Sequence, residues 1–351
     1  MQECTDPFEK RKQDHIKLAL MDINQATEMN AFDTITLQHE ALPDLNFEDI
    51  DLTAQRFGTA VPKPFFVSSM TAGHEQSMTI NRNLVSACAQ NHWAMGVGSQ
   101  RRELNDHTAA KEWELLRKSF PNVSLFSNLG ISQLITSSLD QIQRLIDALQ
   151  AAALIIHCNP LQELIQPEGT PQFKGCWEAL EKITQNLTIP IVIKETGCGF
   201  SPSTLKKLNR LGIAAVDVSG SGGTHWGRIE GHRAEPGSIQ QKAAQTFQRW
   251  GVNTVQSIVN AVVLNPHFEI WGSGGVRHGL DAAKLIALGA NAVGFAKPLL
   301  EAALVSADAV NEKMLSIEYE LKIAMFCTGS RMLIDLRQGL FQATACIREE
   351  K

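Results

Sequence analysis

The sequence lacks the features of several common protein classes. None of its apolar stretches approaches the ~20 residues that a membrane-spanning helix needs. Its N-terminus, MQECTDPFEKRKQDH, is charged and has no apolar segment behind it, which argues against a signal peptide. Its seven cysteines are odd in number, scattered and without a CxxC pair, which disfavours a disulfide framework and a structural zinc site. We therefore expect a protein of the reducing cytoplasm.

The charge of the chain also limits its partners. Its 351 residues carry a formal net charge of −5, so no overall positive field draws it to nucleic acid or to acidic membranes. Any anion that it binds must be held by a local site. The chain is long enough to bury a large core without disulfides.

Several catalytic signatures are missing as well. The Gly-rich string SGSGGTHWG (219–227) lacks the Lys-Ser/Thr ending of a P-loop, and no strand–GxGxxG–helix unit occurs elsewhere. There is no nucleophile elbow and no convincing Ser–His–Asp order. The histidines other than His157 show no metal-ligand spacing, so we expect most of them on the surface or satisfied in the core.

What the sequence does have is eight short apolar runs, each of which ends in a small, polar or Gly-rich tip. Their length and their content of Val, Ile and Phe are typical of buried strands. The runs are 65–70, 93–99, 123–129, 154–159, 189–195, 214–220, 269–275 and 292–298. Segments with helical periodicity separate most of them.

This repeated alternation predicts an α/β fold, a (β/α)8 TIM barrel. Such barrels typically take ~250 residues, so we expect a single domain over residues 1–351 with extensions at both ends. Residues 1–63 would form an N-terminal helix and lead-in, residues 64–303 the barrel, and residues 304–351 C-terminal helices. In this fold the polar tips converge on one face, which carries the active site.

Helices are also expected outside the regular alternation. The N-terminal helix should run from about Asp6 to Met29, with Arg11 and His15 on one face. The widest gap between strands, 220–269, should contain a binding loop or lid and helices over 239–250 and 254–263. The C-terminal stretch 307–340 reads as two helices with a break at 327–330.

The last two tips favour a phosphate site. GSGGVRHG (272–279) and GFAKP (294–298) follow the seventh and eighth strands, where barrels usually bind phosphate. Gly-rich turns at helix N-termini expose backbone N–H groups to an anion. The alternative is that these glycines only permit tight turns.

The fifth tip places Lys194 at the end of a buried strand, where a lysine is costly unless it is paired. It could hold an electron-rich ligand, or it could form a salt bridge to Glu195 or Asp217. A Schiff-base lysine, and with it aldolase chemistry, is a third reading.

The fourth tip, HCNPLQE (157–163), groups His157 and Asn159 on one side of a strand, followed by Gln162 and Glu163. One carboxylate could hold Mg²⁺ on a phosphorylated ligand, because Mg²⁺ uses few protein ligands. A loop that hydrogen-bonds to itself is the alternative.

The remaining tips, SSMTAG (68–73), GSQRR (98–102) and SNLG (127–130), offer neutral polar groups that suit a flat aromatic cofactor. Arg101 and Arg102 are either a phosphate clamp or solvated surface. Trp226 either closes over a ligand or only packs.

Taken in order, these tips resemble the type 2 isopentenyl-diphosphate isomerases, FMN-dependent barrel enzymes of isoprenoid synthesis. The resemblance covers nearly the whole chain: RKQDH (11–15), ALPDL (41–45), SSMTAG, VGSQR, SNLG, IHCNPLQE, PEG (167–169), VIKETGCGFS, VSGSGGTHWGRIE, GSGGVRHGLDAAKLIALGA and GFAKP. The combination of H-x-N-x-x-Q-E with the later Thr-x-Trp is the most specific part. The chain departs from the family's usual pattern at Ala72, Cys158 and Lys297.

The resemblance implies a role for each matching residue. Arg11 and Lys12 would bind the substrate diphosphate; Arg101, His157 and Gln162 would face the substrate; Gln162 and His157 would be catalytic; and Glu163 would ligate Mg²⁺. The flavin would be held by Ser69, Met70, Thr71, Ser99, Asn128, Lys194, Ser219 and Thr224. Its phosphate would be held by Gly274, Gly275, Val276, Ala296 and Lys297.

The resemblance also implies the reaction, the exchange of isopentenyl and dimethylallyl diphosphate. An unactivated alkene is a very poor base, so reduced FMN would be the main acid and base, with Gln162 helping. NADPH would reduce the flavin, and Mg²⁺ with Arg11 and Lys12 would neutralise the diphosphate. The family commonly forms homotetramers or homo-octamers.

Three rival readings remain at this point. A flavin-dependent 2-hydroxyacid oxidase would need a His base and an Arg clamp near the seventh strand, where Arg277 and His278 stand. An IMP-dehydrogenase-like enzyme would need a cysteine in the sixth-tip loop, which instead has Thr224. A flavin- or phosphate-binding barrel without catalytic activity is the third.

Overall fold

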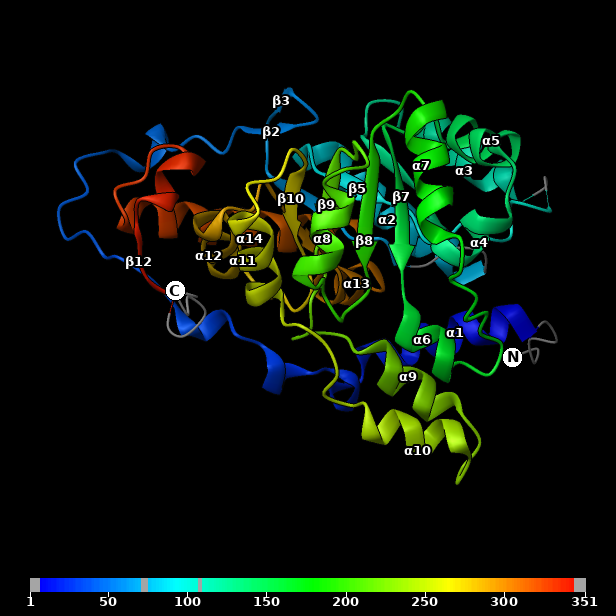
Figure 1. The fold of residues 1–351 in the computed structure, drawn as a ribbon. Helices are drawn as coiled ribbons and strands as arrows, with labels where there is room; N and C mark the ends of the chain where they lie inside the picture. The colour runs from blue at the N-terminus through cyan, green and yellow to red at the C-terminus, as the bar shows by residue number, and fades with distance from the viewer. Residues whose placement is uncertain (1–6, 71–74, 107–108, 344–351) are drawn as a thin grey trace.

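The computed structural model describes residues 7–70, 75–106 and 109–343. Its centre is a closed barrel of eight parallel strands, in the order β10-β11-β4-β5-β6-β7-β8-β9 (Figure 1). The strands are β4 (Phe65–Val67), β5 (Ala94–Gly96), β6 (Leu125–Gly130), β7 (Ala153–Cys158), β8 (Ile191–Glu195), β9 (Ala215–Asp217), β10 (Glu269–Gly272) and β11 (Ala292–Phe295). Six lie within predicted runs, and β6 and β7 each extend one residue beyond theirs, so the predicted (β/α)8 barrel is confirmed.

Strand alternation separates two apolar layers. Phe66, Phe126 and Trp271 point into the barrel and pack together with small inward residues such as Ala153 and Ala215. Their sequence neighbours point outward and pack under the helices, as successive strand residues must.

The next inward position on each strand is polar or glycine. These positions are Ser68, Gly96, Asn128, His157, Lys194, Asp217, Ser273 and Gly294. They form a layer above the aromatic core, at the carboxyl ends of the strands.

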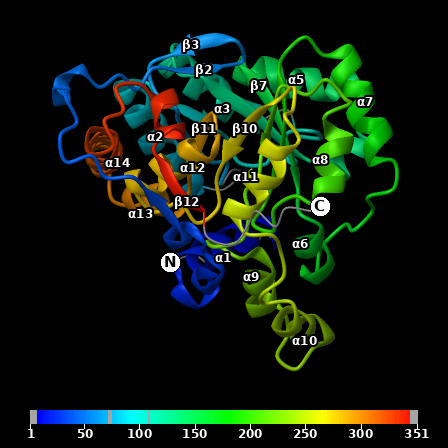
Figure 2. The ribbon, with the colours of Figure 1, turned by 60° about the vertical axis from the view of Figure 1, so that its left-hand side comes forward.

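Most of the helices cover the outside of the barrel (Figures 1 and 2). Those between the strands are α2 (Glu75–Asn91), α3 (Ala110–Ser119), α4 (Ile131–Thr136), α5 (Leu139–Leu149), α6 (Pro160–Ile165), α7 (Cys176–Asn186), α8 (Pro202–Leu208), α9 (Trp226–Arg233), α10 (Ile239–Thr246), α11 (Thr254–Val263) and α12 (Gly279–Leu288). After β11 come α13 (Lys297–Ala303) and α14 (Ala307–Cys327). No helix within the described ranges combines the length and the apolar character needed to cross a bilayer.

A hairpin closes the amino-terminal end of the barrel, opposite α1 (Figure 1). It consists of β2 (Ala54–Arg56) and β3 (Thr59–Val61). Phe57, at its turn, packs on Phe126 and Trp271, and the buried Arg56 donates to the carbonyl of Phe65 at 3.1 Å. Because this end is plugged, a ligand must enter from the other end.

The N-terminal helix is shorter than predicted. Helix α1 spans Pro7–Leu20, and the short 3-10 turns Asp22–Asn24 and Thr27–Met29 replace the rest of the expected helix. The buried side-chain amides of Asn24 and Gln25 donate to the carbonyls of Leu18 and Ala19, at 2.9 and 2.8 Å. These bonds satisfy carbonyls that a longer helix would have used.

Two other boundaries also differ from the prediction. Helix α10 ends at Thr246, before Gly251, which has a φ of +131°. The second C-terminal helix is only a 3-10 turn, Leu333–Arg337, followed by β12 (Leu340–Ala343), which pairs antiparallel with β1 (Ile35–Leu37). Helix α11 has the predicted bounds.

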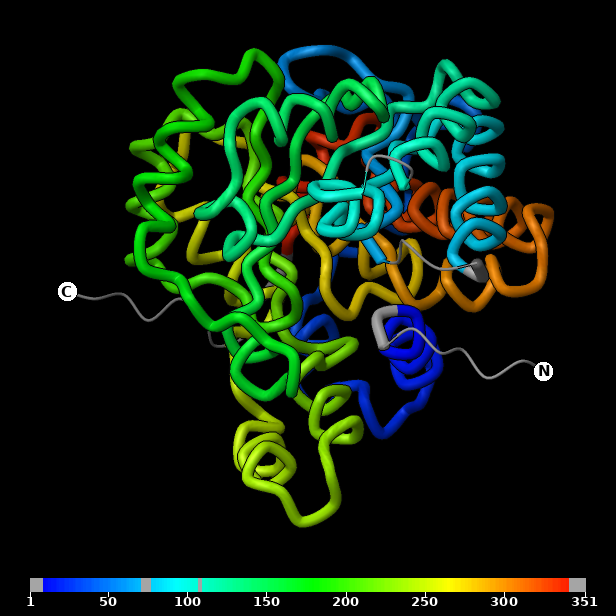
Figure 3. Tube along the Cα trace, turned by 90° about the vertical axis from the view of Figure 1, so that its right-hand side faces the viewer, coloured from blue at the N-terminus to red at the C-terminus, as the bar shows by residue number. Residues whose placement is uncertain are grey.

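Helices α9 and α10 project from the carboxyl-end side of the barrel, where α1 also lies (Figures 1 and 3). Helix α1 packs against both α9 and α13. The N-terminal extension therefore lies over the face where the polar tips meet.

Candidate active site

A cavity of about 690 Å³ opens at the carboxyl ends of the strands. Every described residue that the sequence analysis placed in the site lines it. These residues are Arg11, Lys12, Ser69, Met70, Ser99, Arg101, Asn128, His157, Gln162, Glu163, Lys194, Ser219, Thr224, Gly274, Gly275, Val276, Ala296 and Lys297. Thr71 and Ala72 lie outside the described residues. Trp226 also lines the cavity and packs edge-on against His15, with ring centroids 5.1 Å apart.

The positions of Arg102 and His278 decide between alternatives that the sequence left open. Arg102 does not line the cavity; it pairs with Asp106, and 41% of its side chain is exposed. His278 does not line the cavity; its Nδ1 accepts a hydrogen bond from the backbone N–H of Asp281 and caps α12. His278 is therefore not positioned as the catalytic base of a hydroxyacid oxidase.

Lys194 lies at the floor of the cavity and is almost fully buried. Its Nζ donates to Asp217 Oδ2 at 2.7 Å and to Ser273 Oγ at 3.1 Å. Asp217 is thus the salt-bridge partner, while Glu195 faces outward and accepts backbone N–H bonds from the loop that follows it. Burial raises the pKa of Glu195 to about 7, against the opposing effect of those bonds.

Backbones from the sixth and seventh tips meet at one side of the cavity. A Cβ atom on Gly223 would lie 2.6 Å from the Gly275 nitrogen, and one on Gly274 would lie 2.3 Å from the Gly220 carbonyl oxygen. Gly274 and Gly275 also have positive φ values, +95° and +75°. Glycine is required here by close backbone approach as well as by turn geometry.

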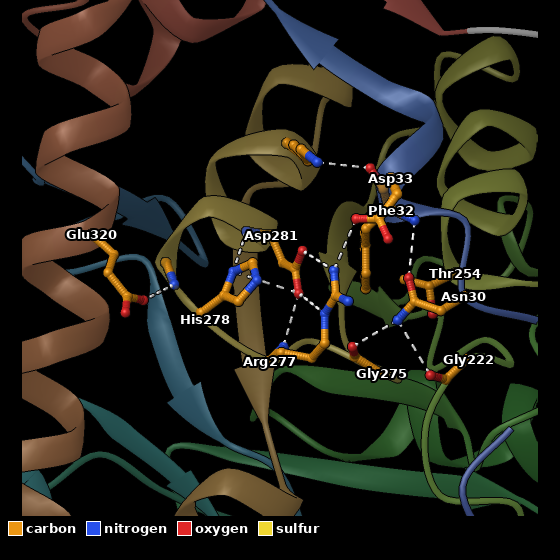
Figure 4. Close-up of polar contacts among 12 residues, drawn as sticks. Asn30, Phe32, Asp33, Gly222, Thr254, Gly275, Arg277, His278, Asp281 and Glu320 are labelled. Atoms are coloured by element: carbon orange, nitrogen blue, oxygen red, sulfur yellow. Dashed lines mark hydrogen bonds and ion pairs between the residues drawn. The ribbon is translucent and has the colours of Figure 1, made fainter. Parts of the chain in front are cut away.

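The lead-in segment after α1 braces these loops (Figure 4). Asn30 Nδ2 donates to the carbonyl of Gly275 at 3.0 Å and to that of Gly222 at 3.3 Å. On the other side, Thr254 Oγ1 donates to the carbonyl of Gly274 at 2.7 Å. With their carbonyls held outside, the loops are free to offer N–H groups to an anion.

Arg277 is held by carboxylates beside these loops (Figure 4). It bonds Asp281 through Nε at 2.9 Å and through Nη2 at 3.0 Å, and Asp33 through Nη2 at 3.2 Å. The hydrogen bonds to Asp281 are the main reason that the pKa of Arg277 is raised. Since both partners fix it, Arg277 is not a free carboxylate clamp.

His157 is neutral. Its Nδ1 lies 2.9 Å from Asn128 Oδ1, while Asn128 Nδ2 donates to the carbonyl of Val97. The amide oxygen can only accept, so Nδ1 carries the proton and Nε2 is an acceptor. Burial, together with the charges of Lys12 and Lys194, lowers the pKa of His157 to about 3.

Gln162 has a defined amide orientation. Its Nε2 donates to Glu230 Oε1 at 3.0 Å, and its Oε1 accepts from Asn159 Nδ2 at 3.1 Å. Glu230 is fully buried and also contacts His15 and Arg233. Burial acts to raise the pKa of Glu230, but the hydrogen bonds from His15 and Gln162 and the charges of His15 and Arg233 outweigh it and hold that pKa low.

Sequence reasoning gave Glu230 no role. It stands in THWGRIE, a string that the family resemblance includes, but a lone carboxylate on a short helix carries no signal of its own. Its importance follows from the packing of α9 against both α6 and α1.

Glu163 is a nearly buried carboxylate. Its Oε1 accepts from Asn159 Nδ2 at 3.0 Å, and its Oε2 accepts from the backbone N–H of Thr170 at 2.6 Å. The neighbouring Asn159 Oδ1 is buried and has no hydrogen-bond partner among the described residues. Nowhere in the described ranges do three or more His, Cys, Asp or Glu side chains gather as a metal cluster, so a cation here would need ligands from a bound molecule.

Helix α1 brings cationic side chains to the same cavity. Burial and the charge of Arg11 lower the pKa of Lys12 to about 8, although Glu103 acts in the opposite direction. Burial also lowers the pKa of Arg11. Cations crowded together in a half-buried site are expected to bind a multiply charged anion.

The fold is shared with known flavoproteins. The flavin-binding domain of baker's yeast flavocytochrome b2 superposes with a TM-score of 0.70 at 17% identity, over 97% of this chain and 84% of that one. A mandelate oxidase variant with an FMN adduct superposes with a TM-score of 0.61 at 17% identity, over 93% of this chain and 90% of that one. At these identities the likeness concerns the fold alone.

Sequence comparison is more specific. The profile of the FMN-dependent dehydrogenases matches residues 161–343. An isopentenyl-diphosphate delta-isomerase of Legionella pneumophila (strain Lens) is 63% identical over 96% of this chain and 99% of its own length. The enzyme of that name from Bdellovibrio bacteriovorus is 51% identical, over 96% and 98%. This chain therefore belongs to the type 2, FMN-dependent family of isopentenyl-diphosphate delta-isomerases.

Proposed function

We propose that this protein interconverts isopentenyl diphosphate and dimethylallyl diphosphate by a 1,3-allylic proton shift, with reduced FMN as acid and base and Mg²⁺ on the diphosphate. One observation carries the proposal: a single cavity combines two groups of anion-binding residues. The glycine loops after β9 and β10 suit a flavin phosphate. Arg11, Lys12 and Arg101 suit a diphosphate.

The lining residues fit FMN. The hydroxyls of Ser68 and Ser69 are buried and have no partner among the described residues, so they are available to a ligand. The cradle formed by Gly223, Gly274 and Gly275 leaves no space for side chains. When bound, reduced FMN would supply a proton donor and stabilise positive charge beside it, which the side chains alone do not offer.

The proposed flavin residues are those of the sequence analysis. The neutral groups that hold the ring would be Ser69, Met70, Thr71, Ser99, Asn128, Ser219 and Thr224, and Lys194 would be the cationic one. Gly274, Gly275, Val276, Ala296 and Lys297 would surround its phosphate. Lys297 Nζ donates to Asp22 at 3.0 Å, which ties the phosphate side to the segment after α1.

Gln162 and His157 would orient the alkene and the protons that move. Gln162 presents an amide held at both ends by Asn159 and Glu230, so it can relay a proton only weakly and mainly positions other groups. Neutral His157 offers an acceptor at Nε2 and adds no positive charge to repel a carbocation-like centre.

Glu163 would hold Mg²⁺ together with phosphate oxygens of the substrate. Mg²⁺ usually binds through one or two carboxylates plus substrate phosphates, and the partnerless Asn159 Oδ1 beside Glu163 could accept from a metal-bound water. Arg11, Lys12 and Arg101 would neutralise the remaining phosphate charge.

An anaerobic assay tests the proposal. Purified protein is supplied with FMN, NADPH, Mg²⁺ and isopentenyl diphosphate, and dimethylallyl diphosphate is measured. The proposal predicts product only when the flavin is reduced, without stoichiometric loss of NADPH. If the protein binds FMN but forms no product, the proposed reaction is rejected and the proposed flavin site stands. If the protein does not bind FMN, both the reaction and the flavin site are rejected.

A further inference from the structure

Asp217 and Lys194 form an ion pair that the proposed reaction does not use directly. The two residues are neighbours in register on β9 and β8, and both point inward. Lys194 lines the cavity, whereas Asp217 does not, and the side chain of Asp217 is 1% exposed. Asp217 therefore cannot touch a ligand in the cavity, except through its partners.

Both oxygens of Asp217 are occupied. Oδ2 accepts from Lys194 Nζ at 2.7 Å, and Oδ1 accepts from Ser273 Oγ at 2.6 Å. Ser273 Oγ in turn accepts from Lys194 at 3.1 Å. Two of the three N–H groups of Lys194 are thus donated to Asp217 and Ser273, which stand in the same layer of inward-pointing residues, and the third has no acceptor among the described residues.

A buried ion pair is costly to desolvate and is weak evidence for a stabilising role. Apolar residues would fill the barrel at this level without that cost, as they do one layer below, at Val192 and Ala215. A function is therefore the better explanation of this pair. Its position under the cavity indicates what the function is.

We propose that Asp217 is a positioning residue that aims Lys194 at the flavin and cancels its charge. This inference rests on the proposed flavin site. A lone ammonium beside the ring would favour reduction, because the ring gains electron density when it is reduced. Paired with Asp217, Lys194 donates a hydrogen bond without adding net charge, so the floor of the site is electrostatically neutral.

The reduction equilibrium of bound FMN tests this proposal without reference to turnover. FMN binding to the unchanged full-length protein is measured first. The midpoint potential of the bound FMN is then measured slightly below neutral pH, by anaerobic dithionite titration with a reference dye. Asp217→Asn should increase the equilibrium constant for reduction about 10-fold, a shift of about 30 mV for a two-electron couple. An unchanged potential with FMN bound would overturn the inference and leave the proposed function intact.

Two further variants separate charge from structure. Ser273→Ala removes a hydrogen bond but keeps both charges, so its equilibrium constant should stay within about 3-fold of the unchanged protein. Asp217→Glu keeps the carboxylate charge beside Lys194 and should also stay within about 3-fold. A shift in Ser273→Ala as large as in Asp217→Asn, or a change of about 10-fold in Asp217→Glu, would overturn the inference. Failure of the unchanged protein to bind FMN would overturn it together with the proposed function.

Discussion

Gln162 Nε2 lies 3.0 Å from Glu230 Oε1, the same oxygen that accepts from His15 Nε2 at 2.8 Å. This one carboxylate oxygen joins α6, α9 and α1, which are far apart in the sequence. The amide of Gln162 is therefore oriented by a residue that the N-terminal helix helps to hold in place.

We expect Glu230→Gln to lower kcat about 10- to 100-fold, because a hydrogen bond to a buried charged acceptor contributes ~1.5–3 kcal/mol. Steady-state kinetics with isopentenyl diphosphate measures the effect. Glu168→Gln is the matched control, since Glu168 also pairs with Arg233 but is largely exposed. Its kcat should change less than about 3-fold. Equal losses in both variants would show that Arg233, not the orientation of Gln162, is what matters.

The lowered pKa of Lys12, about 8, predicts a pH dependence. Lysine is charged below its pKa and neutral above it, so attraction for the diphosphate should be present below about pH 8 and lost as the pH rises above it. The measured quantity is kcat/KM against pH, which reports the free enzyme. Lys12→Arg keeps its charge and should shift the alkaline decline to higher pH. An identical decline in both proteins would assign it to another group.

Glu163→Gln should raise the Mg²⁺ concentration for half-maximal activity at least about 10-fold, because an amide replaces the carboxylate ligand. FMN retention should not change, since the carboxylate bonds Asn159 and Thr170 and not the glycine loops. A Mg²⁺ titration of the rate and a flavin absorbance spectrum test the two parts. Normal Mg²⁺ dependence would contradict the metal role.

Gly223→Ala should separate the two glycine loops, because its Cβ would meet the Gly275 backbone at 2.6 Å. We expect FMN affinity to fall about 10-fold or more and stability to fall by ~1–3 kcal/mol. Gly237→Ala is the control: it carries backbone strain, with a φ of +78°, but its Cβ meets nothing within 4 Å. The FMN affinity of this control, measured by fluorescence titration, should equal that of the unchanged protein. Similar losses in both variants would mean that global destabilisation, not the cradle, controls binding.

The barrel, and the residues that line the cavity at its carboxyl end, could be read from the sequence for a simple reason. Strand alternation and the shared direction of parallel strands bring polar tips to one face, whatever their distance along the chain. The resemblance of the tips to a known family then gave each residue an expected role. Helix boundaries were less predictable, because α1 ends where Asn24 and Gln25 fold back on its carbonyls.

The choice of partners was decided by the tertiary structure. Glu195 is next to Lys194 in the sequence but points to the opposite side of β8, so the salt bridge goes to Asp217 on the neighbouring strand. Glu230 entered the site because α9 packs on α6 and α1. Hydrophobic patterning is local, so the residue types at the ends of the strands follow from the order of amino acids alone. Which of them share a proton, a charge or a hydrogen bond depends on distances between strands and helices, and only the folded chain sets those distances.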